Sequence, residues 1–422
     1  MQIYTHGTLC GTNLVVFFVF KYRMTKNINS YCILRIIMHL VKLNEFLSLF
    51  KATERKYSSI ALKDFVKVAK VRLGKNLVPL TEYMNRKSIH TDTIQELLDN
   101  INARNEYLTR FYNTSLSVHI DNIHMHNTNL KPMKSQELNN NTELVYKNLI
   151  RNMHLTEILQ NTASGMDNVP TYLNVLIDLY THYIIDYKLL TPSATFYIKN
   201  GRIGSVFSSY YFRASIMNPY LVYSLNKSVL RGKRIFTPTL GWSSYCYGFL
   251  ECPEVVEYVG TDVIPSVCKK TREFANMYYD KPLVDIYCVP SEELHKDMDF
   301  MRRYKNHFDV VFFSPPYFKL ELYSGSKQST SRYNDYHDWL SKYWEETIRL
   351  CKHVLIKGGK LCYILSGYGS QSNKLQYDLI TDMNSITRKY FKYNSVRPMY
   401  NKNVHVSTHR PTNEQIVLFT KP

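Results

Sequence analysis

The sequence predicts an α/β fold for residues 233–422, with a seven-stranded, mostly parallel sheet and helices on both faces, after a mainly helical N-terminal region. Two observations carry this prediction. From Lys233 onward, short runs rich in Val, Ile and Phe alternate with segments whose apolar residues recur every three or four positions. Such alternation is typical of βαβ units, in which helices connect parallel strands. The composition, 45% hydrophobic and 21% charged, is that of a globular protein with a core.

The N-terminal half is predicted to be mainly helical. Five segments space their apolar residues as an amphipathic helix does, namely residues 32–50, 57–71, 91–112, 143–161 and 170–190. The stretch from Asp121 to Thr142 is rich in Asn and other polar residues, which is typical of a linker. We therefore expect a helical region of unknown role over residues 1–125, a polar linker over 126–142, a helical and mixed segment over 143–232, and the α/β domain over 233–422.

The α/β domain is predicted to alternate strands with helices. The expected strands are residues 233–237, 257–261, 283–288, 308–313, 360–365, 396–400 and 414–420, and the expected helices are 243–252, 265–279, 291–304, 336–354 and 374–390. Helix 336–354 has the clearest apolar stripe. Gly358 and Gly359 follow it and supply a left-handed turn into the next strand.

The chain is strongly basic. Its 53 Lys and Arg residues exceed its 35 Asp and Glu residues, which gives a formal net charge of +18. This balance favours a polyanionic partner, for which nucleic acid is the natural candidate. A basic surface without a partner is the alternative.

The cysteines and the apolar segments indicate a soluble intracellular protein. The eight cysteines form no CxxC pair, and most lie in apolar segments, so we expect reduced core residues. We expect no metal site, because His119, His124 and His126 lie in a polar stretch typical of a solvated loop. The apolar run from Leu14 to Phe20 is far shorter than the roughly 20 residues that span a bilayer, so we expect no membrane partner. No feature indicates an oligomeric state.

The most informative stretch is the one in which the strand 308–313 runs into Ser314-Pro315-Pro316-Tyr317. The two prolines remove two backbone donors and fix φ, so the strand must stop and the chain is held extended. Ser314 and a neighbouring carbonyl can accept hydrogen bonds from an exocyclic NH2 group, and Tyr317 offers a ring on which a planar base can stack. A proline-rich turn after a core strand is the alternative interpretation of these four residues.

Two further strand ends indicate a ligand site on the same edge of the sheet. The first strand ends in a tight turn over residues 237–244, where Gly241 allows the backbone to approach a ligand closely. The second strand ends at Gly260-Thr261-Asp262, and a carboxylate there can accept both hydrogen bonds of a ribose diol. Taken alone, Asp262 would be a helix N-cap.

Together, these motifs resemble the S-adenosylmethionine-dependent DNA amino-methyltransferases of the SPPY type, in particular phage and large-DNA-virus enzymes. The resemblance covers about residues 195–422. It implies a Rossmann-like class I methyltransferase sheet, S-adenosylmethionine as the cofactor, and methyl transfer to an exocyclic amine in DNA, with cytosine N4 favoured over adenine N6. Nucleic acid is the implied partner, with double-stranded DNA favoured and RNA possible as substrate.

The resemblance also implies roles for individual residues. The target base would be held at the catalytic corner by Ser314, Pro315, Pro316 and Tyr317. The methionine part of the cofactor would lie in the turn that contains Thr237, Pro238, Gly241 and Trp242. Asp262 would bind the ribose, Ile264 would lie beside the adenine, and Ser291 and Glu292 fall where a polar adenine contact is expected. The loop after the corner, with Phe318, Glu321, Tyr323, Gln328 and Ser329, would contact the target strand.

Two departures from the family pattern keep other functions open. Thr237 stands where family members have Asp or Asn, and Ser243 stands where they have a second glycine. Losing that acid removes a contact to the methionine ammonium group, so a degenerate methyltransferase fold that binds nucleic acid or serves as a structural subunit is one alternative. An RNA base methyltransferase is the other, because similar Pro-Pro-aromatic corners occur in that class.

Overall fold

The computed structural model describes residues 39–51, 60–125, 130–165, 169–280, 282–366, 377–399 and 414–422. All of them belong to one compact unit that extends from Ile37 to Pro422. The apolar run 14–20, Cys10, Cys32, His126 and the first residues of the predicted helices 32–50, 57–71 and 374–390 lie outside the described residues, as does the end of the predicted strand 396–400.

The predicted seven-stranded, Rossmann-like sheet is confirmed. Its order is β11-β12-β10-β8-β5-β6-β7. β5, β6, β7, β8 and β10 run parallel to one another, whereas β12 is antiparallel to both β10 and β11. The strands are β5 (Arg234–Thr237), β6 (Glu257–Thr261), β7 (Leu283–Tyr287), β8 (Phe308–Phe313), β10 (Leu355–Leu365), β11 (Lys392–Pro398) and β12 (Gln415–Thr420). Five of the seven differ from the predicted bounds by at most one residue at either end.

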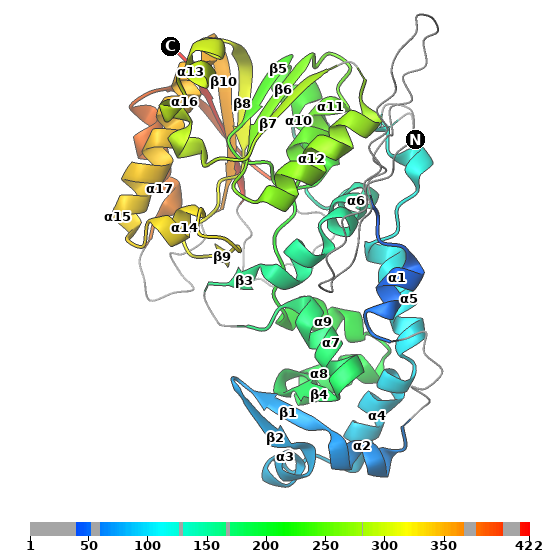
Figure 1. The fold of residues 1–422 in the computed structure, drawn as a ribbon. Helices are drawn as coiled ribbons and strands as arrows, with labels where there is room; N and C mark the ends of the chain where they lie inside the picture. Colours follow the sequence, from blue (N-terminus) through cyan, green and yellow to red (C-terminus); the bar gives the residue numbers. More distant parts are fainter. Residues whose placement is uncertain are drawn as a thin grey trace, which may run out of the picture. The chain divides into compact units, whose positions relative to one another are not determined.

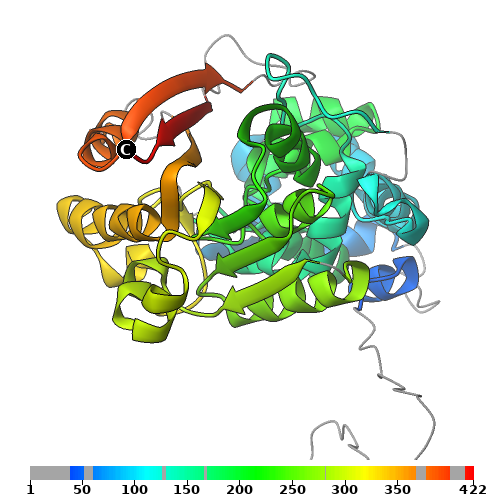
Figure 2. The same ribbon diagram turned by 90° about the horizontal axis from the view of Figure 1, so that it is seen from above.

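Helices cover both faces of this sheet, as Figures 1 and 2 show. The strands they cover are buried on both sides: every residue of β6 is buried, and five of the six residues of β8 are. The covering elements are α10 (Pro219–Leu225), η5 (Asn226–Leu230), α11 (Ser244–Leu250), α12 (Pro265–Tyr278), η6 (Ser291–Lys296), α13 (Met298–Arg303), α15 (Tyr336–Trp339), η7 (Leu340–Glu345), α16 (Glu346–Val354) and α17 (Leu379–Arg388). The predicted helix 336–354 is thus α15, η7 and α16 in succession, with a π-helical stretch at η7.

The N-terminal half is helical, as predicted, but it also holds a small sheet of order β2-β1-β4. Its elements are α1 (Leu43–Ser48), α2 (Leu62–Val68), β1 (Lys70–Leu73), β2 (Asn76–Pro79), α3 (Leu80–Lys87), α4 (Thr91–Asn102), α5 (Arg104–Ser115), η1 (Ile120–Asn122), α6 (Val145–Met153), η3 (Glu157–Asn161), β3 (Ala163–Ser164), α7 (Tyr172–His182), β4 (Ile184–Asp186), η4 (Tyr187–Leu190), α8 (Pro192–Lys199) and α9 (Ile203–Tyr210).

The predicted helices 57–71 and 170–190 are therefore wrong at their C-terminal ends. The first gives way to β1, which forms a hairpin with β2 and pairs in parallel with β4. The second ends at Tyr183, which adopts a left-handed conformation (φ 52°) and turns the chain into β4. In both cases, pairing between distant segments decides a conformation that the local apolar spacing does not.

The stretch expected to be a linker packs against α10. Met133 and Leu138 are buried, the backbone N–H of Met133 donates to Ser224 Oγ over 3.0 Å, and that of Asn218 donates to Asn140 Oδ1 over 2.7 Å. The division of the chain into functional domains stays a prediction.

In the part of the chain that the structure describes, no helix is long and apolar enough to cross a membrane.

Candidate active site

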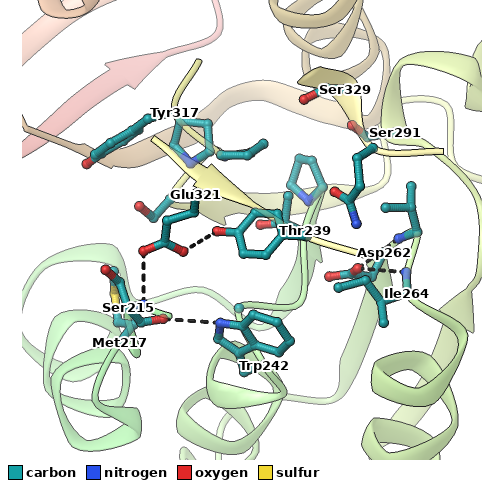
Figure 3. Close-up of a pocket in the computed structure, with 18 of the residues that line it drawn as sticks. Ser215, Met217, Thr239, Trp242, Asp262, Ile264, Ser291, Tyr317, Glu321 and Ser329 are labelled. Atoms are coloured by element: carbon teal, nitrogen blue, oxygen red, sulfur yellow. Dashed lines mark hydrogen bonds between the residues drawn. The ribbon is translucent and has the colours of Figure 1, made fainter. Parts of the chain in front are cut away.

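A cavity that is partly open to solvent lies at the carboxyl ends of the parallel strands. The turn after β5, the loops after β6 and β7, and the corner after β8 all contribute to its walls, which Figure 3 shows in close-up. The cavity thus collects the three strand ends that the sequence analysis singled out.

Most of the predicted site residues line this cavity. They are Pro238, Gly241, Trp242, Asp262, Ile264, Ser291, Glu292, Ser314, Pro315, Pro316, Tyr317, Glu321, Tyr323, Gln328 and Ser329. Two predicted residues lie elsewhere. The Thr237 hydroxyl is fully buried and lies 2.7 Å from the Tyr258 hydroxyl, and the Phe318 ring packs with Tyr336, Trp339 and Tyr377. The structure therefore offers neither side chain to a ligand in the cavity.

The corner after β8 is fixed by contacts from helix α11 and from the end of the neighbouring strand β10. The backbone N–H of Ser314 donates to the Tyr245 hydroxyl over 3.1 Å, and the Ser314 hydroxyl donates to the carbonyl of Ile364 over 3.1 Å. The Tyr317 hydroxyl accepts the backbone N–H of Ser366 over 2.8 Å. Because the Ser314 proton is directed at Ile364, the Ser314 oxygen keeps lone pairs with which to accept a hydrogen bond from a ligand.

The turn after β5 has an unusual backbone. Gly241, Trp242 and Ser243 all adopt left-handed conformations, with φ of 53°, 58° and 69°, which is costly for the two residues that carry side chains. A Cβ atom on Gly241 would overlap the Tyr245 ring, so this glycine admits the tyrosine that holds Ser314. Gly241 was expected to let a ligand approach the backbone closely, and in the structure the Tyr245 ring takes part of that space.

Contacts from the N-terminal half support the same turn. The Ser243 hydroxyl lies 2.9 Å from His154 Nε2 and 2.7 Å from Thr271 Oγ1, and all three side chains are buried. Burial lowers the pKa of His154 to about 3, so the imidazole is neutral and its contact with Ser243 is an ordinary hydrogen bond. Ser243, which stands where the resembled family has a glycine, is therefore held by hydrogen bonds to buried side chains of two other segments.

Asp262 is held by three backbone N–H groups. Its Oδ1 accepts from Val263 over 2.8 Å and from Ile264 over 3.1 Å (Figure 3). Its Oδ2 accepts from Leu240 over 3.2 Å. Burial raises the pKa of this carboxyl group. The contacts to Val263 and Ile264 are those of the N-cap interpretation, and the contact to Leu240 links Asp262 to the turn after β5.

Glu292, after β7, is only 4% exposed and forms an ion pair with Arg332, whose Nη1 lies 2.8 Å from Oε1. The same guanidinium contacts Glu293 Oε1 over 2.6 Å. Burial raises the pKa of Glu292 to about 7. Arg332 belongs to α14 (Ser329–Arg332), so this ion pair ties the loop that follows the corner to the β7 side of the cavity.

Glu321 connects that loop to the turn after β5. Its Oε1 accepts the backbone N–H of Ser215 over 3.0 Å, and its Oε2 accepts the Tyr323 hydroxyl over 2.6 Å. The indole N–H of Trp242 donates to the Ser215 carbonyl over 3.1 Å, and the Trp242 and Tyr323 rings meet edge to face. Figure 3 shows this chain of contacts along one wall. Glu321 begins the short strand β9 (Glu321–Leu322), which pairs with β3.

Sequence reasoning missed several residues that line the cavity, among them Tyr245, Tyr343 and Glu414. Tyr245 lies in α11 with no local motif around it. Tyr343 lies in the π-helical η7, and such segments are frequent at functional sites. Glu414 directly precedes β12. Its position at the start of a predicted strand was visible in the sequence, but its place in the cavity depends on the sheet order.

Among the described residues, no group of three or more His, Cys, Asp and Glu side chains could hold a metal ion. The six described cysteines are all free.

Comparisons with known proteins give structural likeness alone. No protein-family model and no curated protein matches the chain. Among solved structures, it is similar to the N-methyltransferase NodS from Bradyrhizobium japonicum with bound S-adenosyl-L-homocysteine (10% identity, TM-score 0.32, 48% of this chain and 83% of that one). It is also similar to TrmN from Thermus thermophilus (13%, 0.33, 49% and 49%) and to the [4+2]-cyclase SpnF (13%, 0.35, 49% and 83%). Likeness at this level says nothing about substrate or cofactor.

Proposed function

We propose that the protein transfers the methyl group of S-adenosylmethionine to an exocyclic amine of a base in nucleic acid, with DNA and cytosine N4 favoured. The observation that carries this proposal is the convergence of three strand ends on one cavity. Asp262 after β6 and the Gly241–Trp242 turn after β5 lie on one side, and the Ser314–Tyr317 corner after β8 lies beside them. A cofactor and a base held at these two places would be neighbours.

The residues of the cavity fit the cofactor. The Tyr343 hydroxyl is buried and has no hydrogen-bond partner among the described residues, although it lines the cavity near Glu292 and Asp262. A buried polar group without a partner is costly in a folded protein, so a polar ligand is expected there. Asp262 would hold the ribose, Glu292 and Tyr343 would face the adenosine, and the turn with Pro238, Gly241 and Trp242 would hold the methionine part.

When bound, the cofactor would supply a methyl group on a cationic sulfur. The residues of the chain would then contribute by positioning the target base. The exocyclic amine of cytosine or adenine is a poor nucleophile, because its lone pair is delocalised into the ring. Hydrogen bonds from its two N–H groups to Ser314 Oγ and the Pro315 carbonyl favour a pyramidal, more reactive nitrogen. The Tyr317 ring would orient the base so that its amine nitrogen faces the methyl group that the cofactor would supply. The base must leave the stack to reach this corner.

The position of Thr237 bears on the alternative of a degenerate fold. Thr237 replaces an expected acid, but its side chain contacts Tyr258 and does not line the cavity. An acid at position 237 is therefore not needed to line the cavity, and other residues would contact the cofactor. The cavity supports an active enzyme better than a degenerate fold.

Methyl transfer from labelled S-adenosylmethionine to unmethylated DNA and to RNA, followed by nucleoside analysis, tests the proposal. We expect label on N4-methylcytosine from DNA. Ser314→Ala should lower the rate about 10- to 100-fold, the usual effect of losing a hydrogen bond at a reacting group. Ser209→Ala, an exposed serine of α9, is the matched control and should keep the wild-type rate.

Label found in RNA alone would move the protein to the RNA methyltransferases. Transfer to neither nucleic acid, with no binding of S-adenosylhomocysteine, would show a fold without this activity.

A further inference from the structure

Four carboxyl groups line the cavity, and three of them have evident partners. Asp262 accepts three backbone N–H groups, Glu292 is paired with Arg332, and Glu321 accepts from Ser215 and Tyr323. The fourth, Glu414, is partly buried and forms no hydrogen bond or ion pair through its carboxyl group with any described residue. A carboxyl group that is partly removed from water and has no protein partner is available to a ligand in the cavity.

The sheet order places Glu414 on the target side of the cavity. Asp262 and Glu292 follow β6 and β7, on one side of β5 and β8, whereas β10 and β12 lie on the other side. Because β12 runs antiparallel to β10, its first residues reach the edge where β10 ends, and Gln415 is opposite Leu365. The next residue after Leu365, Ser366, donates its N–H to the Tyr317 hydroxyl. Glu414 therefore lies beside the corner that would hold the base.

The charged and titratable groups that face Glu414 are few. Among the described residues, Lys147 of α6 is the cation that acts on it, and the hydroxyls of Tyr245 and Tyr317 are the other titratable groups that its charge reaches. Burial raises the pKa of Glu414, and burial lowers the pKa of Lys147 to about 7. A base in the cavity would displace more water from Glu414 and so favour its neutral form further.

We propose that the Glu414 carboxyl donates a hydrogen bond to the ring nitrogen next to the reacting amine and thereby selects the target base. This inference rests on the proposed function. There, Ser314 and Pro315 take both N–H groups of the amine, so a further polar group beside the base can meet only another atom of its edge. A carboxylic acid kept neutral by its surroundings is an effective donor in such a place.

The bases differ at the atom in question. In cytosine, N3 flanks the amine and accepts a hydrogen bond, and in adenine, N1 does the same. In guanine, two ring nitrogens flank the amine: N1 carries a proton and donates, and N3 accepts. A neutral carboxyl group that donates therefore matches the one ring nitrogen beside the amine of cytosine or adenine, and it rejects guanine that is bound through N1, in the same way that a site built for one hydrogen-bond pattern rejects the other. The contact serves selection of the base; the methyl transfer itself takes place at the amine.

Three variants test this role: Glu414→Ala, Glu414→Gln, and Glu137→Gln as an exposed control. An amide can donate a hydrogen bond to a ring nitrogen at any pH. We therefore expect kcat/KM for the methylated base to fall about 10- to 100-fold in Glu414→Ala and to stay within a few-fold of wild type in Glu414→Gln. S-adenosylhomocysteine affinity and the midpoint of thermal unfolding should stay near the wild-type values in all three, which separates a base contact from misfolding.

The pH profile gives a second readout. The neutral form donates, so the wild-type rate should fall as pH rises through the pKa of Glu414 in the complex, whereas Glu414→Gln should lack this alkaline limb. An active wild type whose rate is unchanged in Glu414→Ala would overturn this inference alone, as would equal losses in the Ala and Gln variants. A wild type that binds cofactor and methylates no base would overturn the proposed function and this inference together.

Discussion

Glu292 is the residue whose charge should set how cofactor affinity depends on pH. Burial raises its pKa to about 7 while Arg332 holds the ionised form, and an ionised carboxylate can accept an N–H group of adenine. Because protonation removes that acceptor, affinity for S-adenosylhomocysteine should weaken below pH 7, by up to about tenfold per pH unit. Calorimetric titrations between pH 5.5 and 8.5 measure this, and Glu292→Gln should flatten the curve. A Gln variant with the wild-type curve would show that another group titrates.

At this scale, the sequence predicts best the residues that carry a local signal. Ser314 and its two prolines follow a clear strand, and Asp262 directly follows β6, the second strand before it in the chain. Their meeting in one cavity therefore follows from parallel-strand topology. Tyr245 and Glu414 carry no such signal, because the packing of distant elements brings Tyr245 into contact with Ser314 and places Glu414 in the wall of the cavity. Thr237 illustrates the opposite error. It stands at a strand end, yet its side chain faces Tyr258.

Between elements, the N-terminal helices support the turn after β5. His154, just after α6, contacts Ser243, and Lys270 of α12 donates to the Met153 carbonyl over 2.8 Å. Because three successive residues of that turn are left-handed, we expect it to depend on this support. His154→Ala should weaken S-adenosylhomocysteine binding about tenfold, measured by calorimetry.

The conservative variant separates support of the turn from a general loss of packing. His154→Gln keeps a polar group near the position of Nε2 and should recover part of the affinity. His182→Ala, at the exposed end of α7, should bind as the wild type does. Equal affinities of the wild type and His154→Ala would contradict this role.

The elements of the α/β domain could be predicted because their sequences and their tertiary surroundings agree. β8 is apolar except for Asp309, and both β8 and β6 are buried on both faces, so propensity and packing point the same way. In the N-terminal half they do not agree. The residues of β1 continue the helical spacing of α2, but pairing with β2 and β4 makes them a strand. The helix 336–354 was predicted, but its π-helical turn was not, since no residue type marks one.

For the whole molecule, the net charge of +18 is not evenly distributed. Residues 62–87, which form α2, the β1–β2 hairpin and α3, contain seven Lys and Arg residues against two Asp and Glu residues. Six of the seven cations are exposed, namely Lys63, Lys67, Lys70, Lys75, Arg86 and Lys87, whereas Arg72 pairs with Asp178. A cluster of this kind is suited to phosphate contacts, which depend on charge and not on base sequence.

Replacing Lys67, Lys70 and Lys75 by Ala should therefore weaken DNA binding and reduce its dependence on salt. Each phosphate contact that is lost should lower the slope of log K against log salt by about 0.9, so the triple variant should lose up to roughly 2.7, whatever the DNA sequence. The matched control replaces Lys305, Lys389 and Lys392, which are exposed and lie toward the edge of the large sheet opposite the cavity. Fluorescence anisotropy with one duplex at several salt concentrations measures both slopes. If the two triple variants change the slope equally, the basic segment 62–87 is a solvated surface and DNA contacts must come from elsewhere. If only the first variant changes the slope, and S-adenosylhomocysteine binding is unaffected, this segment holds the nucleic acid whose base enters the cavity.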